Sequence, residues 1–135
     1  MAYWLLKSEP GVYSIEDLKR DGSTVWDGVR NNTAALHLKA MKVGDEALFY
    51  HSQSDKAVVG TAKIIKEAFP DKSDPTGRYV AVEIGYGSTV KAPVTLSTMK
   101  ATPALAEMQV VKMSRFSVSK VTAEEWKTVL KMTEG

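Results

Sequence analysis

Short apolar runs separated by clusters of turn residues are the feature that most limits how this chain folds. Four of these runs have the length and residue types of β-strands, at Tyr3–Leu6, Glu46–His51, Ala57–Lys66 and Tyr79–Tyr86. The clearest loop is Pro70–Gly77, which is dense in residues that favour turns. Because regular helices do not alternate with the strands, the sequence predicts an α+β domain around a curved, barrel-like sheet.

Capping residues mark the expected helices near the two ends of the chain. Ser14, with Asp17 three positions later, predicts the N-cap of a short helix that ends near Gly22. Thr122 and Glu125 form the pattern of a capping box and predict a closing helix.

The middle of the chain gives weaker signals. A second helix is expected from Asn32, or from the threonine after it, to about Met41. Residues 93–108 are expected to form short helices, with Thr102 as an N-cap. Ser114–Ser119 alternates like a half-buried strand.

Composition places the chain among ordinary globular proteins. The 135 residues, 44% hydrophobic and 25% charged, predict one domain that spans residues 1–135. The absence of cysteine excludes disulfides, thiolate zinc sites and cysteine nucleophiles. No apolar segment is long enough to span a bilayer, and the first residues lack the basic leader of a signal peptide. We therefore expect a soluble, cytoplasmic protein with no membrane partner.

The formal net charge of +2 limits the kind of partner. A protein that grips a long stretch of nucleic-acid backbone usually carries far more positive charge. If the partner is nucleic acid, we expect few phosphate contacts and a specific pocket.

The segment Thr24-Val-Trp-Asp-Gly-Val-Arg-Asn-Asn32 places a tryptophan among many hydrogen-bonding groups. Trp26 is either a core residue beside a turn or one wall of a pocket that recognises a flat ligand. Trp4 and Trp126 are expected in the core.

Enzyme motifs are absent from the sequence. There is no glycine-rich phosphate loop, and the two histidines, His37 and His51, lack the spacing of metal ligands. We expect no catalysis, no cofactor and no metal. His51 lies where an apolar strand ends, so the alternative is an enzyme acting on a nucleotide with His51 as general base.

A series of motifs, taken together, resembles a known family. They are Tyr3-Trp-Leu-Leu-Lys-Ser-Glu-Pro10, Trp26-Asp-Gly-Val-Arg-Asn31, Met41-Lys-Val-Gly-Asp45, Phe49-Tyr-His-Ser52, Glu67-Ala-Phe-Pro-Asp71 and Ser114-Arg-Phe-Ser-Val118. In this order they resemble the EVE domain family of the PUA-like superfamily, which is similar to YTH domains. The resemblance covers essentially the whole chain and implies a small PUA-like β-barrel of mixed strands, flanked by short helices.

The resemblance also implies a function, the reading of a modified nucleobase. EVE domains are associated with 5-methyl- or 5-hydroxymethylcytosine in DNA, and a base read in this way is flipped into an aromatic pocket. The residues expected in the base-binding pocket are Ser8, Trp26, Asp27, Gly28, Asn31, Tyr50, His51 and Ser52. The residues expected to contact phosphate are Lys7, Arg30 and Arg115.

Two alternatives and one departure from the family pattern stay open at this point. Other PUA-like domains bind RNA, and a protein-interaction module with a vestigial pocket also fits the motifs. The second helix of the family usually carries an arginine and an asparagine where this chain has Ala35 and Leu36. If those side chains reach the ligand, this protein prefers a different base.

Overall fold

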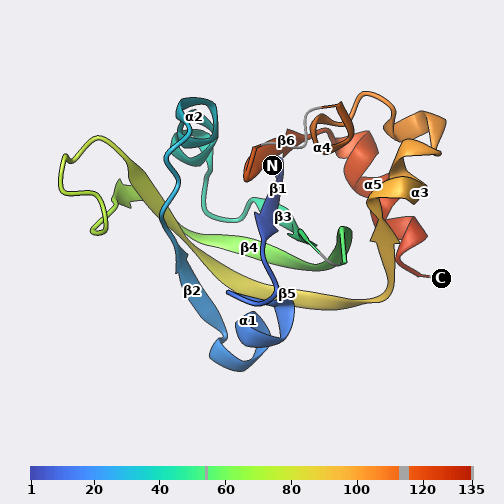
Figure 1. Ribbon diagram of the computed structural model, residues 1–135, viewed down its shortest axis with the longest axis horizontal. Helices are drawn as coiled ribbons and strands as arrows, with labels where there is room; N and C mark the ends of the chain where they lie inside the picture. Colours follow the sequence, from blue (N-terminus) through green and yellow to red (C-terminus); the bar gives the residue numbers. More distant parts are fainter. Residues whose placement is uncertain (54, 113–115, 135) are drawn as a thin grey trace.

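The structure, a computed structural model, describes residues 1–53, 55–112 and 116–134 of the chain. Its centre is a six-stranded sheet in the order β2-β5-β4-β3-β1-β6 (Figure 1). The strands are β1 Tyr3–Ser8, β2 Ser23–Trp26, β3 Glu46–His51, β4 Ala57–Pro70, β5 Val80–Thr95 and β6 Val118–Val121.

The sheet mixes both strand directions. β1 pairs in parallel with β3 and antiparallel with β6. β3, β4 and β5 form an antiparallel meander, and β2 adds to the other side of β5. This arrangement confirms the expected α+β class and its mixed strands.

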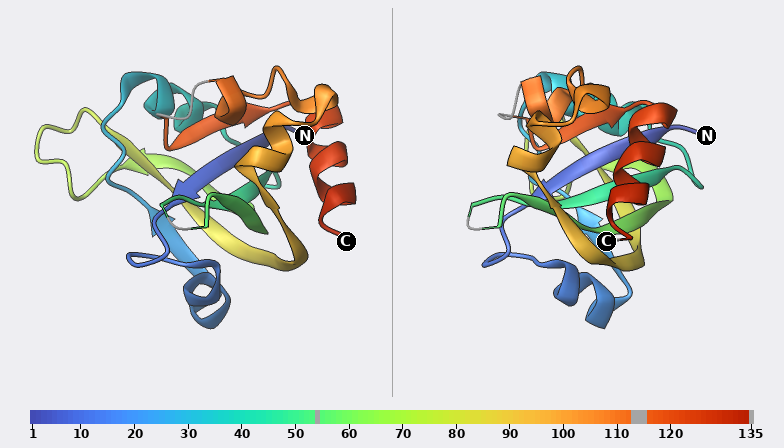
Figure 2. Two further views of the ribbon diagram at one scale, coloured as in Figure 1. Left: turned by 45° about the vertical axis from the view of Figure 1, so that its right-hand side comes forward. Right: turned by 90° about the vertical axis from the view of Figure 1, so that its right-hand side faces the viewer.

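The sheet curls strongly (Figure 2), but it does not close into the barrel expected from the sequence. β2 and β6 are the edge strands, and no backbone ladder joins them within the described residues. Helix α2, Asn32–Ala40, contacts β4, β5 and β6 instead. Its side chains Ala34, Ala35 and Leu38 are buried, so this helix covers part of the core beside these strands.

Irregularities between β4 and β5 bend the sheet. At one of them the register shifts between Thr61 and Ala62, opposite the part of β5 that contains Gly87. A Cβ at Gly87 would lie 2.5 Å from the Thr61 Oγ1 atom and 2.8 Å from the Thr61 carbonyl oxygen. Only glycine allows this close approach of the two strands.

The helices begin and end at local signals. The first and last are α1 Ile15–Asp21 and α5 Ala123–Met132. Capping boxes between Ser14 and Asp17 and between Thr122 and Glu125 confirm the sequence predictions. α2 is capped one residue earlier than expected, because the Asn31 side chain accepts a hydrogen bond from the Ala34 amide at 3.0 Å.

The region after residue 86 differs from the prediction. β5 continues to Thr95, so the expected helix at residue 93 is wrong and α3, Leu96–Lys100, starts after a Thr95 cap. Pro93 fits in this strand because residues 90–93 of β5 have no Cα partner in β4. The remaining short helices are η1 Pro103–Leu105 and α4 Gln109–Lys112.

Three further details correct the sequence predictions. Thr102 makes no side-chain cap for η1, because its hydroxyl donates to the Thr98 carbonyl at 2.7 Å. β2 was not expected, and it contains Trp26. The strand expected at Ser114–Ser119 begins only at Val118, and its first two residues lie outside the described part of the chain.

Two clusters of buried side chains pack on the two faces of the sheet. Because side chains alternate along a strand, Phe49 belongs to the first cluster and Tyr50 to the second. Trp4 and Trp126 are 3% and 5% exposed, which confirms both as core residues. The Trp4 indole N–H donates to the Asp45 carboxylate at 3.1 Å, so its polar edge is satisfied. No helix in the described part of the chain is long and apolar enough to span a bilayer.

Candidate nucleic-acid interface

An open cleft of about 500 Å³ lies between the carboxyl end of β1 and the edge strand β2. Both strands contribute to its wall, the turn between β1 and α1 contributes Glu9, Val12 and Tyr13, and Asp27 follows directly after β2. The lining residues are Lys7, Ser8, Glu9, Val12, Tyr13, Thr24, Val25, Trp26 and Asp27. The structure thus brings together Lys7, Ser8, Trp26 and Asp27, four of the residues that the sequence singled out.

Trp26 belongs both to the core boundary and to the cleft. Its ring is partly buried and packs against the first core cluster, where it meets Phe49 edge-on with 5.9 Å between ring centroids. The rest of the ring lines the cleft. A tryptophan that is fixed on one side and open on the other suits a stacking surface, because little side-chain freedom is lost when a ligand binds.

Tyr13 supplies a second aromatic side chain that the sequence analysis did not assign to the site. Its hydroxyl donates to the Asp21 carboxylate at 2.9 Å, and its carbonyl accepts from the Ser8 hydroxyl at 2.5 Å. Burial, and then the bond to Asp21, raises the pKa of Tyr13 above its usual value. Tyr13 is therefore a neutral, anchored ring at physiological pH.

The mouth of the cleft is unusually apolar for a solvated surface. Val12 and Val25 are 76% and 46% exposed, and both line the cleft. Large apolar side chains in contact with water lose that contact when a ligand covers them, which favours binding.

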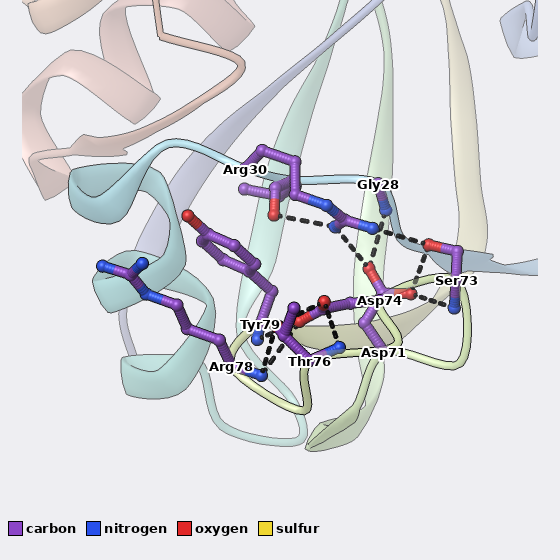
Figure 3. Close-up of polar contacts among 9 residues, drawn as sticks. Gly28, Arg30, Asp71, Ser73, Asp74, Thr76, Arg78 and Tyr79 are labelled. Atoms are coloured by element: carbon purple, nitrogen blue, oxygen red, sulfur yellow. Dashed lines mark hydrogen bonds and ion pairs between the residues drawn. The ribbon is translucent and has the colours of Figure 1, made fainter.

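The segment that follows Trp26 is held in place by one buried carboxylate. Asp71, directly after β4, accepts from the Gly28 amide at 2.9 Å and from Arg30 Nη1 at 3.0 Å (Figure 3). The backbone amide and hydroxyl of Ser73 bind its other oxygen at 2.8 and 2.6 Å. Burial alone would raise the pKa of Asp71, but the hydrogen bonds from Ser73, Gly28 and Arg30 outweigh it and hold the pKa well below its usual range.

Gly28 and Arg30 therefore have structural partners in this arrangement. Gly28 has φ of +76°, a backbone conformation that glycine adopts with least strain. Arg30 also donates to the Ser73 hydroxyl at 3.0 Å, and its guanidinium lies 5.2 Å from the centre of the Tyr79 ring. Arg30 keeps 41% of its side-chain surface exposed beside the cleft.

Five of the expected pocket residues do not line this cleft. One is Gly28, whose amide binds Asp71. Asn31 is the N-cap of α2. Tyr50 is buried in the second core cluster, whereas the Trp26 ring packs on the first, and burial raises the pKa of Tyr50. The Ser52 amide donates to the Ser8 carbonyl at 2.9 Å. His51 lines a separate hollow of about 330 Å³.

His51 is held through both ring nitrogens. The Ile15 amide donates to its Nε2 at 3.0 Å, and its Nδ1 lies 2.7 Å from an Asp55 carboxylate oxygen. Because Nε2 accepts, the proton is on Nδ1 and is donated to Asp55. In this arrangement neither ring nitrogen is available to take a proton from a substrate.

The two other expected phosphate contacts differ in what the structure shows. Lys7 lines the cleft, its ammonium lies 5.9 Å from the centre of the Tyr50 ring, and burial lowers its pKa. Arg115 lies outside the described residues.

The two positions that depart from the family pattern are on α2. Ala35 is buried and Leu36 is exposed, and neither lines the cleft.

Sequence reasoning missed Tyr13 and Asp71 for different reasons. Tyr13 precedes the Ser14 cap and has the ordinary position of a residue that staples a helix start. Asp71 follows Pro70 at the edge of a loop, where aspartate is common in turns. The motif Glu67-Ala-Phe-Pro-Asp71 was the available signal, although it did not indicate which group the carboxylate binds.

The fold and the cleft define a class of protein, an α+β domain with an aromatic cleft at one edge of its curved sheet. The EVE domain model matches residues 2–132, and the chain belongs to the EVE domain family.

Relatives are found in animals and bacteria. Thymocyte nuclear protein 1 of Rattus norvegicus is 36% identical over 98% of this chain and 74% of its own length. The solved structure of Rpa0253 from Rhodopseudomonas palustris is 50% identical, with a TM-score of 0.94, and the match covers 98% of this chain and 93% of that one.

Two further solved structures contain nucleic acid. Human THYN1 in complex with DNA containing 5-methylcytosine is 34% identical, with a TM-score of 0.89 over 100% of this chain and 99% of that one. The YTH domain of Zygosaccharomyces rouxii MRB1, in complex with N6-methyladenosine RNA, is 20% identical. Its TM-score of 0.60, over 99% of this chain and 87% of that one, shows a shared fold.

The comparisons correct one sequence-based expectation. A cytoplasmic location was inferred from the composition, but curated relatives are named as nuclear proteins. Composition does not distinguish compartments that share a reducing environment.

Proposed function

We propose that this protein is a non-catalytic reader of a modified base in DNA, in which 5-methylcytosine or 5-hydroxymethylcytosine leaves the duplex and enters the cleft beside Trp26. The observation that supports this most directly is the half-buried Trp26 ring on the wall of an open cleft. The human THYN1 structure, similar over the whole chain, contains DNA with 5-methylcytosine.

The energy of stacking suits this role. Removing a base from a duplex costs a few kcal/mol, and stacking it on an aromatic ring returns about 1–3 kcal/mol. Trp26 provides that ring, and its contact with Phe49 fixes the ring before the base arrives. Tyr13 lines the same cleft and adds a second flat surface.

Polar groups at the cleft match the edge of cytosine. Asp27 is exposed at the rim, and its carboxylate accepts from an exocyclic amine such as cytosine N4, a pairing that geometry favours. The Ser8 hydroxyl donates to Tyr13, so its oxygen keeps a lone pair for a donor on the ligand.

The exposed valines provide a place for the modification. A 5-methyl group adds apolar surface to the base edge, and Val12 and Val25 offer apolar surface at the cleft mouth. Burial of one methyl group is worth about 1 kcal/mol, which predicts a preference of about fivefold for the methylated base.

Binding without catalysis agrees with the state of His51. A general base needs a free nitrogen within hydrogen-bond reach of its substrate. Both nitrogens of His51 are held by Ile15 and Asp55, and its hollow is lined by different residues from the Trp26 cleft.

Fluorescence anisotropy tests this function. The ligands are labelled DNA oligonucleotides with one cytosine, 5-methylcytosine, 5-hydroxymethylcytosine or N6-methyladenine, together with a ribose version of each. Trp26→Ala is compared with wild type and with Tyr86→Ala, which removes another half-buried ring packed on the same core but outside the cleft.

We expect a preference for one modified cytosine in DNA that Trp26→Ala abolishes and Tyr86→Ala preserves. A preference for the ribose oligonucleotides would instead support an RNA-binding module, since the 2′-hydroxyl distinguishes the two sugars. Equal binding to every ligand, unchanged by Trp26→Ala, would rule out this proposal.

A further inference from the structure

The connection between β4 and β5, residues 71–79, projects from the sheet beside the segment that carries Asp27 and Arg30 (Figure 1). Two bonds to Asp71, from the Gly28 amide and from the Arg30 guanidinium, join this loop to the rim of the cleft. The base of the loop is therefore fixed relative to the segment that follows Trp26 and Asp27.

The loop is also internally rigid. One oxygen of Asp74 accepts from the amide and hydroxyl of Thr76 at 2.9 and 2.6 Å, and the other from the amides of Arg78 and Tyr79 at 2.9 and 2.7 Å (Figure 3). These bonds, led by that from the Thr76 hydroxyl, lower the pKa of Asp74 to about 2. A loop organised before binding loses less conformational entropy on contact with a partner.

The two acidic groups of the loop, Asp71 and Asp74, accept the hydrogen bonds described above, whereas its basic side chains are exposed. Lys72 and Arg78 are exposed, and neither forms an ion pair with any residue that the structure describes. The outward charge of the loop is therefore positive.

Arg78 is the best placed of these cations. Its guanidinium lies 5.6 Å from the centre of the Tyr79 ring, and Arg30 lies 5.2 Å from the same ring. Figure 3 shows the Tyr79 ring between the two arginine side chains. The Arg78 guanidinium makes no hydrogen bond within the described part of the chain, so all its donors remain available.

We propose that Arg78, held on Tyr79, binds a backbone phosphate of the nucleic-acid strand that flanks the base in the Trp26 cleft. This inference rests on the proposed function and adds a second contact outside the cleft. A guanidinium matches the geometry of a phosphate through paired N–H donors, and stacking on an aromatic ring leaves those donors free at its edge. The site contributes affinity without reading the base, because phosphate is common to every nucleotide.

The test is anisotropy with 5-methylcytosine DNA and cytosine DNA over a series of salt concentrations. Arg78→Ala is compared with wild type and with Lys127→Ala, which removes an exposed cation from α5 at the opposite end of the molecule (Figure 1). Thermal unfolding of each variant checks that the fold is retained.

We expect Arg78→Ala to weaken binding of both DNAs by the same factor, about threefold to tenfold. The slope of log Kd against the logarithm of salt concentration should fall by about one, as expected for one lost phosphate contact. Arg78→Lys should keep the salt dependence and lose part of the affinity, because lysine keeps the charge without the paired donors. Lys127→Ala should match wild type.

Two results would overturn this inference while leaving the reader function intact. One is wild-type affinity and salt dependence for Arg78→Ala when Trp26→Ala still abolishes base preference. The other is a change in base preference with Arg78→Ala, which would place its action in the cleft instead of on the backbone. Loss of any effect of Trp26→Ala would reject the proposed function itself.

Discussion

The carboxylate of Asp71 accepts a hydrogen bond from the backbone amide of Gly28 at 2.9 Å, although the two residues are 43 positions apart in the sequence. The same Asp71 oxygen, Oδ2, also accepts a hydrogen bond from Nη1 of Arg30. One buried acid therefore holds both the Gly28 backbone and the Arg30 guanidinium, which follow Trp26 in the chain. The wall of the cleft thus depends on a residue that does not line it.

Asp71→Asn should loosen this wall. The amide cannot satisfy the Gly28 N–H, Arg30 and Ser73 together, and it leaves Arg30 without its ion pair. We expect a loss of about 2 kcal/mol in the free energy of unfolding and weaker base preference. Chemical denaturation and oligonucleotide titration of the same preparation measure the two effects.

The control for this substitution is Asp55→Asn, which alters an exposed partner of His51 away from the cleft. A base preference unchanged in Asp71→Asn, despite the lower stability, would show that the contact maintains the fold only.

Acid should remove the contribution of Asp71 and Asp74 together. Both pKa values are lowered in the folded state, that of Asp74 to about 2. Their stabilising contribution is therefore fully present above the unfolded pKa of about 3.9 and is lost as pH falls through that value toward the folded pKa.

Thermal unfolding between about pH 7 and about pH 2.5 measures this loss. We expect Tm of wild type to fall below about pH 4, and Tm of the double variant Asp71→Asn and Asp74→Asn to depend less on pH in that range. If Tm falls equally with pH in the two proteins, other carboxylates dominate the loss of stability in acid.

Local features of the fold were predictable from the sequence because their partners lie three positions apart. The Ser14 and Thr122 capping boxes each satisfy amides with side chains of the same turn, so the pattern alone identifies them. The strand at Glu46–His51 was also predicted with its observed bounds, because its apolar run is bounded by turn residues.

Features that need distant partners were not predictable in this way. β2 is a short edge strand that exists only because it pairs with β5, and its own residues alternate weakly. β5 passes through Pro93, which argues locally against a strand. The strand tolerates Pro93 because residues 90–93 have no partner in β4, and the Ala92 amide finds its acceptor outside the sheet, at the Thr133 carbonyl.

The same contrast between local signals and distant partners applies to the residues of the site. Trp26 and Asp27 were identified from an unusual combination of residue types in one segment. Tyr13 and Asp71 reach the site through the turn after β1 and through the β4–β5 loop, and their position follows only from the assembled sheet.

Gly28→Ala should destabilise the cleft through the backbone. Gly28 has φ of +76°, where a Cβ adds strain of about 1–2 kcal/mol, although no atom lies within 4 Å of that Cβ position. Gly11→Ala is the matched control, since it also has open space but no positive φ. We expect a lower Tm for Gly28→Ala only, and equal Tm values for the two variants would show that the loop relaxes without strain.

The apolar mouth of the cleft should set the preference for the methyl group. Val25→Thr keeps the branched shape that suits β2 and replaces one methyl with a hydroxyl, so the strand is retained while the surface becomes polar. If Val25 faces the 5-methyl group, the ratio of Kd values for cytosine and 5-methylcytosine DNA falls from about fivefold toward one.

The same variant should change the response to 5-hydroxymethylcytosine in the opposite sense, because the new hydroxyl offers a hydrogen-bond partner to the hydroxymethyl group. Val43→Thr is the matched control, since Val43 is 60% exposed but lies away from the cleft. If Val25→Thr leaves the ratio of the cytosine and 5-methylcytosine Kd values unchanged and Val12→Thr reduces it, the methyl group lies on the β1–α1 turn. If neither variant changes the ratio, the methyl group lies elsewhere in the cleft.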